Sequence, residues 1–356
     1  QSFLALGRQQ PLDPRPRSPV GLGDLATLRY TSGTTGRPKG VMFRHDGLRW
    51  MGETMAALLP WRARTRRARY LSFLPLNHVV EGILVAYAGY YIPQALDIYF
   101  LEDFRQAQRY LPQVKPTFFF SVPRVFERAW EGLEESRPGK FYLGLAHGPV
   151  KNALRPVLRW SLLGKLGLRT ASQLAIGSAV ASEKLLLNFR ELGIELHNAY
   201  GLTEAPLVTL NREGANWIGT VGAALPATEV RLAEDGEVLV RGPQVTAGYF
   251  EADAPSPVQD GWLHTGDLGR LTEDGYLVLE GRKKELFKTS YGKYVQPAKV
   301  EALLRDIPGI AETLLVGEGR PFCVALLWII DPDDAPSEAA ISRAMADLSR
   351  GLSHPE

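Results

Sequence analysis

Short runs of β-branched and aromatic residues alternate with helix-like stretches through the first half of the chain, and this order restricts the folds open to it. The runs lie at residues 69–74, 117–122, 174–177 and 194–198. A helix is predicted to begin at Pro123, because proline lacks an N–H that would be unpaired in the first turn anyway. Another is predicted after Ser182, whose hydroxyl can cap the first turn. Strand–helix–strand spacing of this kind predicts an α/β fold with a parallel sheet and crossover helices.

The later part of the chain has a different sequence pattern, in which alternating runs are separated by Asp-Gly. Asp235-Gly236 separates two alternating runs, residues 229–232 and 237–241, and Asp274-Gly275 separates a second such pair. Asp-Gly between alternating apolar residues is a strong hairpin signal. This part therefore predicts an antiparallel or β-barrel-like subdomain.

Shifts in composition divide the chain into four parts. Residues 1–27 begin with a stretch rich in Pro, Arg and Gln and are interpreted as a linker or a remnant of a missing N-terminal region. Residues 28–218 are predicted to form the α/β core, and residues 219–283 the antiparallel subdomain. Residues 284–356 predict a partial α+β domain with a helix at 297–304, two strands around 317–321 and a helix from Ser337.

Composition excludes several classes of function. A hydrophobic content of 45% and a charged content of 22% are typical of a globular protein, and the net charge of +2 gives no reason to expect nucleic acid as a partner. The single cysteine, Cys323, excludes an internal disulfide framework and a Cys-rich zinc site. Nothing in the sequence is typical of a signal peptide or a membrane span, which predicts a cytoplasmic location.

A loop at residues 30–40 combines hydroxyls, glycines and one lysine directly after an apolar run. The hydroxyl-bearing residues, glycines and lysine of this loop include Thr31, Ser32, Gly33, Thr34, Thr35, Gly36 and Lys39. Glycines let backbone N–H groups approach an anion closely, and a lysine adds a mobile positive charge. The loop therefore predicts polyphosphate binding. It is not a Walker loop, because Lys39 is preceded by Pro38 and followed by Gly40.

Two further polar segments follow predicted strands. His78 ends the first of these strands, and alone it is more typical of a structural histidine than of a catalytic one. The second segment contains Tyr200, Gly201, Thr203 and Glu204. We expect it at the carboxyl edge of the sheet, where α/β proteins bind ligands. An aromatic ring, a hydroxyl and a carboxylate at this edge suit a base, a phosphate and a divalent cation.

Two more polar segments lie in the antiparallel subdomain and at its end. Asp267 follows a glycine turn, where a carboxylate often bonds to its own backbone. Arg282 opens a charged run at residues 282–285, which by itself suggests a solvated linker.

Taken together and in this order, these segments resemble the adenylate-forming superfamily of acyl- and aryl-CoA synthetases, luciferases and peptide-synthetase adenylation domains. The resemblance runs from Leu28 to the C-terminus and is weaker between Glu131 and Ala171. Residues 119–127 and 281–294 are most similar to long-chain fatty acyl-CoA synthetases. The implied fold is an incomplete large adenylate-forming domain, whose α/β core binds nucleotide and acyl group, followed by the small β-barrel-like subdomain and a partial α+β C-terminal domain.

The resemblance implies ATP-dependent activation of a long-chain fatty acid. The carboxylate of the fatty acid would attack the α-phosphate of ATP, giving acyl-adenylate and pyrophosphate, and the thiol of CoA would then displace AMP. Positioning and charge stabilisation contribute much of the catalysis in such displacements. The implied small molecules are the fatty acid, ATP, Mg²⁺ and CoA.

The resemblance also assigns residues to the nucleotide. The loop from Thr31 to Lys39 would hold the β- and γ-phosphates. Tyr200, with Gly201 beside it, would stack on adenine next to the turn formed by Gly177, Ser178 and Ala179.

Four residues would carry the chemistry, and others would hold the ribose and CoA. The four residues for the chemistry are Lys39, Thr203 at the α-phosphate, Glu204 on Mg²⁺ and His78 beside the reacting carboxylate of the fatty acid. A carboxylate such as that of Glu204 is a preferred ligand of Mg²⁺. Asp267 would accept both ribose hydroxyls, and Arg282 would reach the ribose or a phosphate. Lys284 aligns with the family's hinge. Lys288 and the Gly292 region would face the bound CoA.

Departures from the family leave alternatives open. The family has a long stretch before its phosphate loop and a charge-neutralising lysine segment near its C-terminus, and residues 1–356 contain neither. We therefore expect impaired adenylation. The alternatives are a non-catalytic module that binds ATP or acyl-adenylate, and acyl transfer to the phosphopantetheine of a carrier protein. Peripheral contact with a membrane also stays open, because the implied substrate is a lipid.

Overall fold

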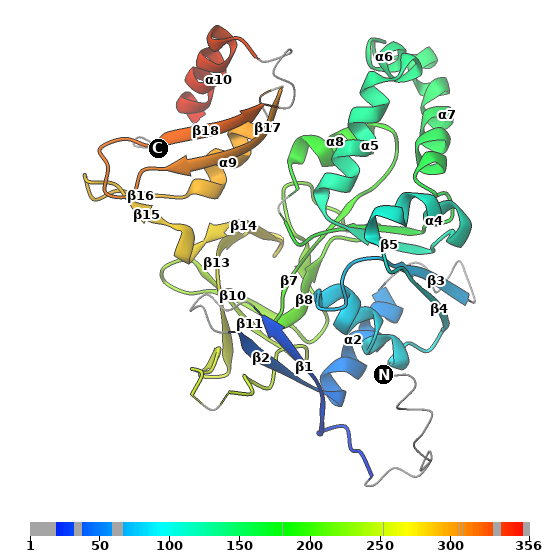
Figure 1. The fold of residues 1–356 in the computed structure, drawn as a ribbon, viewed down its shortest axis with the longest axis vertical. Coiled ribbons are helices and arrows are strands. Elements are labelled where there is room, and N and C mark those ends of the chain that lie inside the picture. The colour runs from blue at the N-terminus through cyan, green and yellow to red at the C-terminus, as the bar shows by residue number, and fades with distance from the viewer. Residues whose placement is uncertain are drawn as a thin grey trace, which may run out of the picture.

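The computed structural model describes residues 19–31, 38–58, 67–179, 181–251, 253–305, 307, 309–329 and 336–351. The predicted phosphate loop from Ser32 to Gly36 and most of the N-terminal linker lie outside these residues. Figure 1 shows a central sheet with helices on both of its faces, which leads, through a second sheet, into a smaller C-terminal part. No helix among the described residues is long and apolar enough to cross a membrane.

The central sheet confirms the predicted α/β fold. Its strands have the order β5-β6-β7-β8-β9, with β5, β6 and β7 parallel and the last two pairs antiparallel. The strands are β5 (Phe118–Ser121), β6 (Gln173–Ile176), β7 (His197–Leu202), β8 (Ala205–Leu210) and β9 (Ala223–Ala224). The crossover helices are α5 (Pro123–Glu135), α6 (Arg137–Leu143) and α7 (Pro149–Lys165) before β6, and α8 (Glu183–Glu191) before β7.

The predicted helix starts are confirmed as well. Pro123 occupies the first turn of α5. The Ser182 side chain accepts a hydrogen bond from the Leu185 N–H at 3.2 Å and so caps α8.

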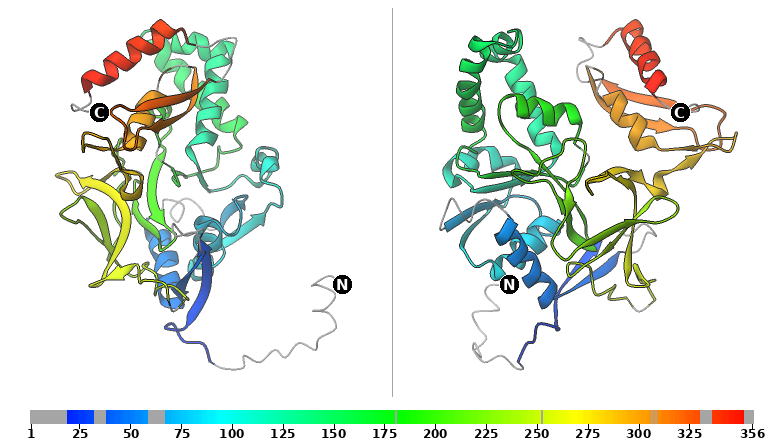
Figure 2. Two further views of the ribbon diagram at one scale, coloured as in Figure 1. Left: turned by 60° about the vertical axis from the view of Figure 1, so that its left-hand side comes forward. Right: turned by 180° about the vertical axis from the view of Figure 1, so that it is seen from behind.

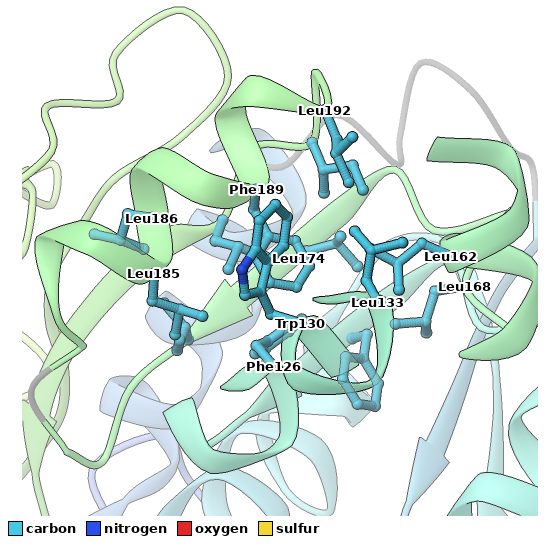
Figure 3. Close-up of a cluster of buried hydrophobic side chains, with 14 of the residues drawn as sticks. Phe126, Trp130, Leu133, Leu162, Leu168, Leu174, Leu185, Leu186, Phe189 and Leu192 are labelled. Carbon is cyan, nitrogen blue, oxygen red and sulfur yellow. The ribbon is translucent and has the colours of Figure 1, made fainter. Parts of the chain in front are cut away.

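An aromatic and leucine-rich core holds these helices on the sheet. Phe126 and Trp130 of α5 meet Phe189 of α8, with ring centroids 5.7 Å apart in both pairs. Figure 3 shows Leu133, Leu162 and other leucines packed around these rings. Burying such large apolar side chains supplies the main stabilisation of this layer.

Before the central sheet, the chain forms two pairs of strands and several helices. Strands β1 (Leu25–Thr31) and β2 (Lys39–Arg44) are antiparallel, and β3 (Arg67–Ser72) and β4 (Ala95–Phe100) are parallel. The helices are α2 (His45–Leu58), the π-helix η1 (Val80–Val85), the 3-10 helices η2 (Ala88–Tyr91) and η3 (Phe104–Gln106), and α4 (Ala107–Val114).

The second sheet confirms the antiparallel subdomain and both predicted hairpins. Its strands are β10 (Glu229–Leu232), β11 (Glu237–Arg241), β12 (Val258–Gln259), β13 (Trp262–Leu271) and β14 (Leu277–Arg282). The order is β10-β11-β13-β12, and β14 pairs with β13. Gly236 and Gly275 occupy the two turns with φ of 82° and 78°, a conformation that glycine adopts without steric cost.

The C-terminal part is the predicted α+β unit. Its elements are η4 (Lys283–Glu285), β15 (Phe287–Lys288), β16 (Tyr294–Val295), α9 (Pro297–Arg305), β17 (Ile310–Val316), β18 (Val324–Ile329) and α10 (Glu338–Gly351). Figures 1 and 2 place β17, β18 and α10 beyond β14, on the other side of the molecule from α6 and α7.

The strand predicted at residues 194–198 differs most from the structure, whereas the bounds of those predicted at 69–74, 117–122 and 174–177 differ by one or two residues. Residues 194–198 were expected as a strand, but β7 begins at His197 and continues through Leu202. Ile194 and Leu196 are buried in the helix-side core, so they give the alternating apolar pattern of a strand before the ladder begins. Tyr200 and Gly201 therefore lie within β7, and only Thr203 and Glu204 form the turn into β8.

Candidate active site

A hydrogen-bonded group of three side chains joins the two sheets. The Tyr200 hydroxyl of β7 donates to Oδ2 of Asp267 at 2.6 Å, and Nε of Arg282 lies 3.0 Å from Oδ1 of the same carboxylate. Asp267 and Arg282 face each other across β13 and β14, which explains why they meet. Three residues that were predicted separately from sequence are thus brought together around one carboxylate.

The Asp267 carboxylate is costly to keep charged in this position. It is only 4% exposed, and burial raises its pKa above the usual value of 3.8, although the Tyr200 hydrogen bond and the Arg282 charge both oppose this shift. Burial also raises the pKa of Tyr200 well above its usual value. A carboxylate can accept about four hydrogen bonds, so Asp267 retains acceptor capacity for a pair of ligand hydroxyls.

A second group extends from the turn after β7 to β2. The Tyr249 hydroxyl donates to Oε1 of Glu204 at 2.7 Å, and Nζ of Lys39 lies 4.8 Å from the centroid of the Tyr249 ring. The Glu204 carbonyl accepts from the Thr246 N–H at 2.8 Å, which fixes the turn. Thr31 lies opposite Lys39 in the β1–β2 ladder.

Glu204 suits a nucleotide-bound Mg²⁺ better than a resident metal. Within the described ranges, no group of three or more His, Cys, Asp or Glu side chains could hold a metal ion. Mg²⁺ is commonly held by one or two carboxylates together with substrate phosphates and water. Glu204 and Lys39 both contact Tyr249, and a single carboxylate of this kind fits that mode of binding.

His78 faces the turn after β6. Its Nδ1 accepts from the Val80 N–H at 3.3 Å, so the neutral ring carries its proton on Nε2, which lies 3.0 Å from the Ser178 hydroxyl. Ser178 has a φ of 65°, a left-handed conformation that is uncommon for a residue with a side chain. The turn therefore presents a hydroxyl to the imidazole, and Ala179 follows it at the surface.

Glycines let this turn and β7 approach their neighbours closely. A side chain at Gly177 would place Cβ 2.8 Å from the Ala199 carbonyl oxygen. One at Gly201 would collide with the carbonyl of Pro206. Neither position tolerates a Cβ without moving backbone, which explains why both motifs contain glycine here.

An apolar cavity of about 50 Å³ lies under these residues. Val79, Phe120 and Leu207 line its apolar part, while Ser178 and Tyr200 reach its edge from the polar groups described above. The cavity places apolar surface next to His78 and the Tyr200 segment, as an acyl group attached to a nucleotide would need.

Sequence reasoning missed two residues that hold the His78 segment. Arg29 of β1 donates to the carbonyls of Leu76, at 3.0 Å, and Gly82. Glu81, fully buried in η1, accepts from the Phe73 N–H and from the Tyr70 hydroxyl at 3.2 Å each. Their partners lie far away in sequence or on the backbone, so neither residue belongs to a recognisable local pattern.

Tyr249 was also missed, and only its neighbourhood offered a signal. It follows Gly248, whose φ of 122° requires glycine, and it forms an isolated bridge with Val41 next to the phosphate loop. A glycine followed by an aromatic residue suggests a turn, but it does not indicate which carboxylate the ring will meet.

The residues expected to face CoA lie beyond β14. Lys284 is in η4, directly after the Arg282 strand. Nζ of Lys288 lies 5.2 Å from the Tyr294 ring, and Gly292 turns the β15–β16 hairpin with a φ of 80°. They belong to the C-terminal part, and their role stays a prediction.

The His78 environment predicts a pH-dependent contribution to stability. Burial lowers the pKa of His78 below 6.5, so the unfolded chain binds a proton more readily than the native one. The native state should therefore lose stability as the pH falls from 6.5 toward the lowered pKa. Urea unfolding over this range should show a smaller loss in His78→Gln than in the wild type. Parallel curves for the two proteins would contradict the assignment.

Comparison with known proteins identifies the family of the chain. A family model described as AMP-binding enzyme matches residues 3–250. The long-chain-fatty-acid–CoA ligase FadD15 of Mycobacterium bovis is 36% identical, over 87% of this chain and 55% of that protein. Long-chain-fatty-acid–CoA ligase 5 of Mus musculus is 32% identical, over 93% of this chain and 52% of that protein. The chain thus spans about half the length of the curated relatives it matches.

A solved structure extends the likeness to the fold. ATP-bound MatB from Rhodopseudomonas palustris is 26% identical and superposes with a TM-score of 0.72, covering 94% of this chain and 63% of that one. Because the family model matches well over half of its residues, the chain belongs to the AMP-binding enzyme family.

Proposed function

We propose that the chain carries the nucleotide and acyl site of a long-chain fatty acid–CoA ligase. Such an enzyme uses ATP to convert a fatty acid into acyl-adenylate and pyrophosphate, and then transfers the acyl group to the thiol of CoA with release of AMP. Membership of the AMP-binding family and the names of the relatives support this reaction class. The observation that supports this site most strongly is the position of the short segment from Tyr200 to Glu204. Tyr200 bonds to Asp267 at one end of it, and Glu204 bonds to Tyr249, which lies against Lys39, at the other.

The geometry suggests a division of labour within that segment. Asp267 would accept the ribose hydroxyls, with Tyr200 and Arg282 orienting its carboxylate. At the other end of the segment, Lys39 and Glu204 would face the phosphates, Glu204 by holding Mg²⁺. The Mg²⁺, when bound, would offset the negative charge of the phosphates as the leaving pyrophosphate departs.

The acyl side would involve His78 and the turn after β6. The neutral imidazole donates from Nε2 to the Ser178 hydroxyl, so the same N–H could be offered to a carboxylate oxygen. The cavity beside it would receive the first carbons of the acyl chain. Thr203 would contact the α-phosphate, and Lys284 would lie at a hinge between the half-reactions, with Lys288 and Gly292 toward CoA.

Fatty-acid-dependent exchange of labelled pyrophosphate into ATP tests this function. With Mg²⁺ and palmitate, the chain should exchange label faster than Glu204→Gln does, and exchange should stop when palmitate is omitted. Exchange at the same rate with and without palmitate would contradict the proposal. Binding of an acyl-adenylate analogue without any exchange would instead favour the non-catalytic module. Product formed on carrier-protein phosphopantetheine, but not on CoA, would favour a carrier-protein acceptor.

A further inference from the structure

A break in the ladder between β11 and β13 lies beside the proposed ribose acceptor. The two strands pair at Leu239 and again at Glu237, and between these points residues 265–267 of β13 all lie opposite Val238. Such a bulge changes the direction of the side chains near it and is common next to active sites. Asp267 is the last residue of this bulge, and its carboxylate reaches the tyrosine of the central sheet.

Two residues within the bulge shape its backbone. Gly266 has a φ of 72°, which glycine adopts without steric cost. The Thr265 hydroxyl donates to the Val238 carbonyl at 2.7 Å and accepts from the Asp267 N–H at 3.1 Å. These bonds replace part of the ladder that the bulge interrupts. The Gly266 N–H bonds to a side chain of β11 instead of the backbone.

That side chain is Glu237, whose carboxylate bonds to the neighbours of both Asp267 and Arg282. Its Oε1 accepts from the Gly266 N–H at 2.9 Å, one residue before Asp267. Its Oε2 accepts from Nζ of Lys283 at 3.1 Å, one residue after Arg282. Asp267 and Arg282 face each other across β13 and β14, so one carboxylate is tied to the chain next to each member of the pair.

Glu237 is enclosed and well supplied with donors. It is 6% exposed, and Nδ1 of His264 lies 3.3 Å from its Oε2. Burial alone would raise the pKa of Glu237, but the bonds from Gly266, Lys283 and His264 hold this pKa below its usual value. Nζ of Lys283 is also 2.5 Å from Oδ2 of Asp235, which keeps the ammonium in place. A buried charge with several fixed donors forms a rigid support, because losing a donor leaves the charge without solvation.

We propose that Glu237 is a positioning residue for the nucleotide, which holds the β13 bulge so that the Asp267 carboxylate meets the ribose hydroxyls and keeps Arg282 beside that carboxylate. Both of its oxygens are bonded within the protein, so Glu237 acts on the nucleotide through Asp267 and Arg282. The inference rests on the proposed nucleotide site and adds to it a residue that supports the ribose contact from behind.

Calorimetry with ATP and with dideoxy-ATP, which lacks both ribose hydroxyls, separates positioning of Asp267 from general stability. The dissociation constant of dideoxy-ATP divided by that of ATP measures the contact with the hydroxyls. In the wild type this ratio should be about one hundred, whereas Asp267→Ala should bind the two ligands about equally. Glu237→Gln keeps the shape but not the charge. It should lower the ratio about tenfold by weakening ATP, with little change in the binding of dideoxy-ATP.

Lys283→Met tests the same support at a side chain that is 44% exposed, where a substitution does not endanger folding. It should lower the ratio about threefold, because partly exposed ion pairs contribute less than buried ones. Glu229→Gln is the matched control. It neutralises an exposed carboxylate of β10 that pairs with Arg241, and it should keep the wild-type ratio.

The outcomes distinguish this role from the proposed function. A wild-type ratio in both Glu237→Gln and Lys283→Met would overturn the positioning role and leave the nucleotide site standing. Equal weakening of ATP and dideoxy-ATP in Glu237→Gln would show a general structural role and would also overturn it. If Glu237→Gln does not fold, the ratio in Lys283→Met decides. No binding of ATP to the wild type, or equal binding of the two ligands, would overturn both the inference and the ribose site.

Discussion

Replacing Asp267 by alanine should raise the dissociation constant for ATP by about a hundredfold, because two hydroxyl bonds to a charged acceptor would be lost. Burial already raises the pKa of this carboxylate, so in the absence of ligand its charge lacks the solvation that water would give. Hydroxyl donors from a ribose would supply part of that solvation. Isothermal titration calorimetry with ATP and Mg²⁺ measures the effect.

A nearby aspartate provides the matched control for this variant. Asp274 lies exposed in the turn between β13 and β14, on the same hairpin as Asp267. Asp274→Ala should bind ATP like the wild type. ATP affinity that is equal in Asp267→Ala and Asp274→Ala would remove Asp267 from the nucleotide site.

Replacing Glu204 by glutamine should lower fatty-acid-dependent pyrophosphate exchange by about a hundredfold, because a carboxylate that stabilises charge through Mg²⁺ would become neutral. The amide keeps the shape and can still accept from the Tyr249 hydroxyl, so the free energy of unfolding should change little. The Mg²⁺ concentration needed for half-maximal exchange should rise at the same time.

Tyr249→Phe separates positioning from metal binding at the same carboxylate. It removes the hydroxyl that donates to Oε1 of Glu204 and keeps the ring that lies beside Lys39. Exchange should fall less than in Glu204→Gln, with a smaller rise in the Mg²⁺ requirement. An unchanged Mg²⁺ requirement in Glu204→Gln would be incompatible with the proposed role of this residue.

The fold was predictable where the signal is local. The Asp235-Gly236 hairpin and the Ser182 cap depend on a few adjacent residues, and both occur in the structure as expected. The start of β7 was wrong, because Ile194 and Leu196 are buried before the strand ladder begins. Burial and strand pairing give the same apolar pattern in sequence, and only the partner strand distinguishes them.

The site was predictable as a set of residues but not as an arrangement. Tyr200, Asp267 and Arg282 were each expected near a nucleotide, whereas their shared hydrogen-bonded carboxylate depends on how two sheets meet. Tyr249 and Arg29 had no local motif at all. Arg29 fits because Gly82 lacks a side chain, since a Cβ there would lie 2.7 Å from the guanidinium carbon. Such pairings belong to the tertiary structure.

The central claim is that one site in this chain binds both parts of an acyl-adenylate. Calorimetry with a non-hydrolysable palmitoyl-adenylate analogue tests it most directly. We expect saturable binding that is tighter than that of ATP or palmitate alone, is displaced by ATP, and is strongly weakened in Asp267→Ala. No binding, or binding that ATP does not displace and Asp267→Ala does not weaken, would contradict it.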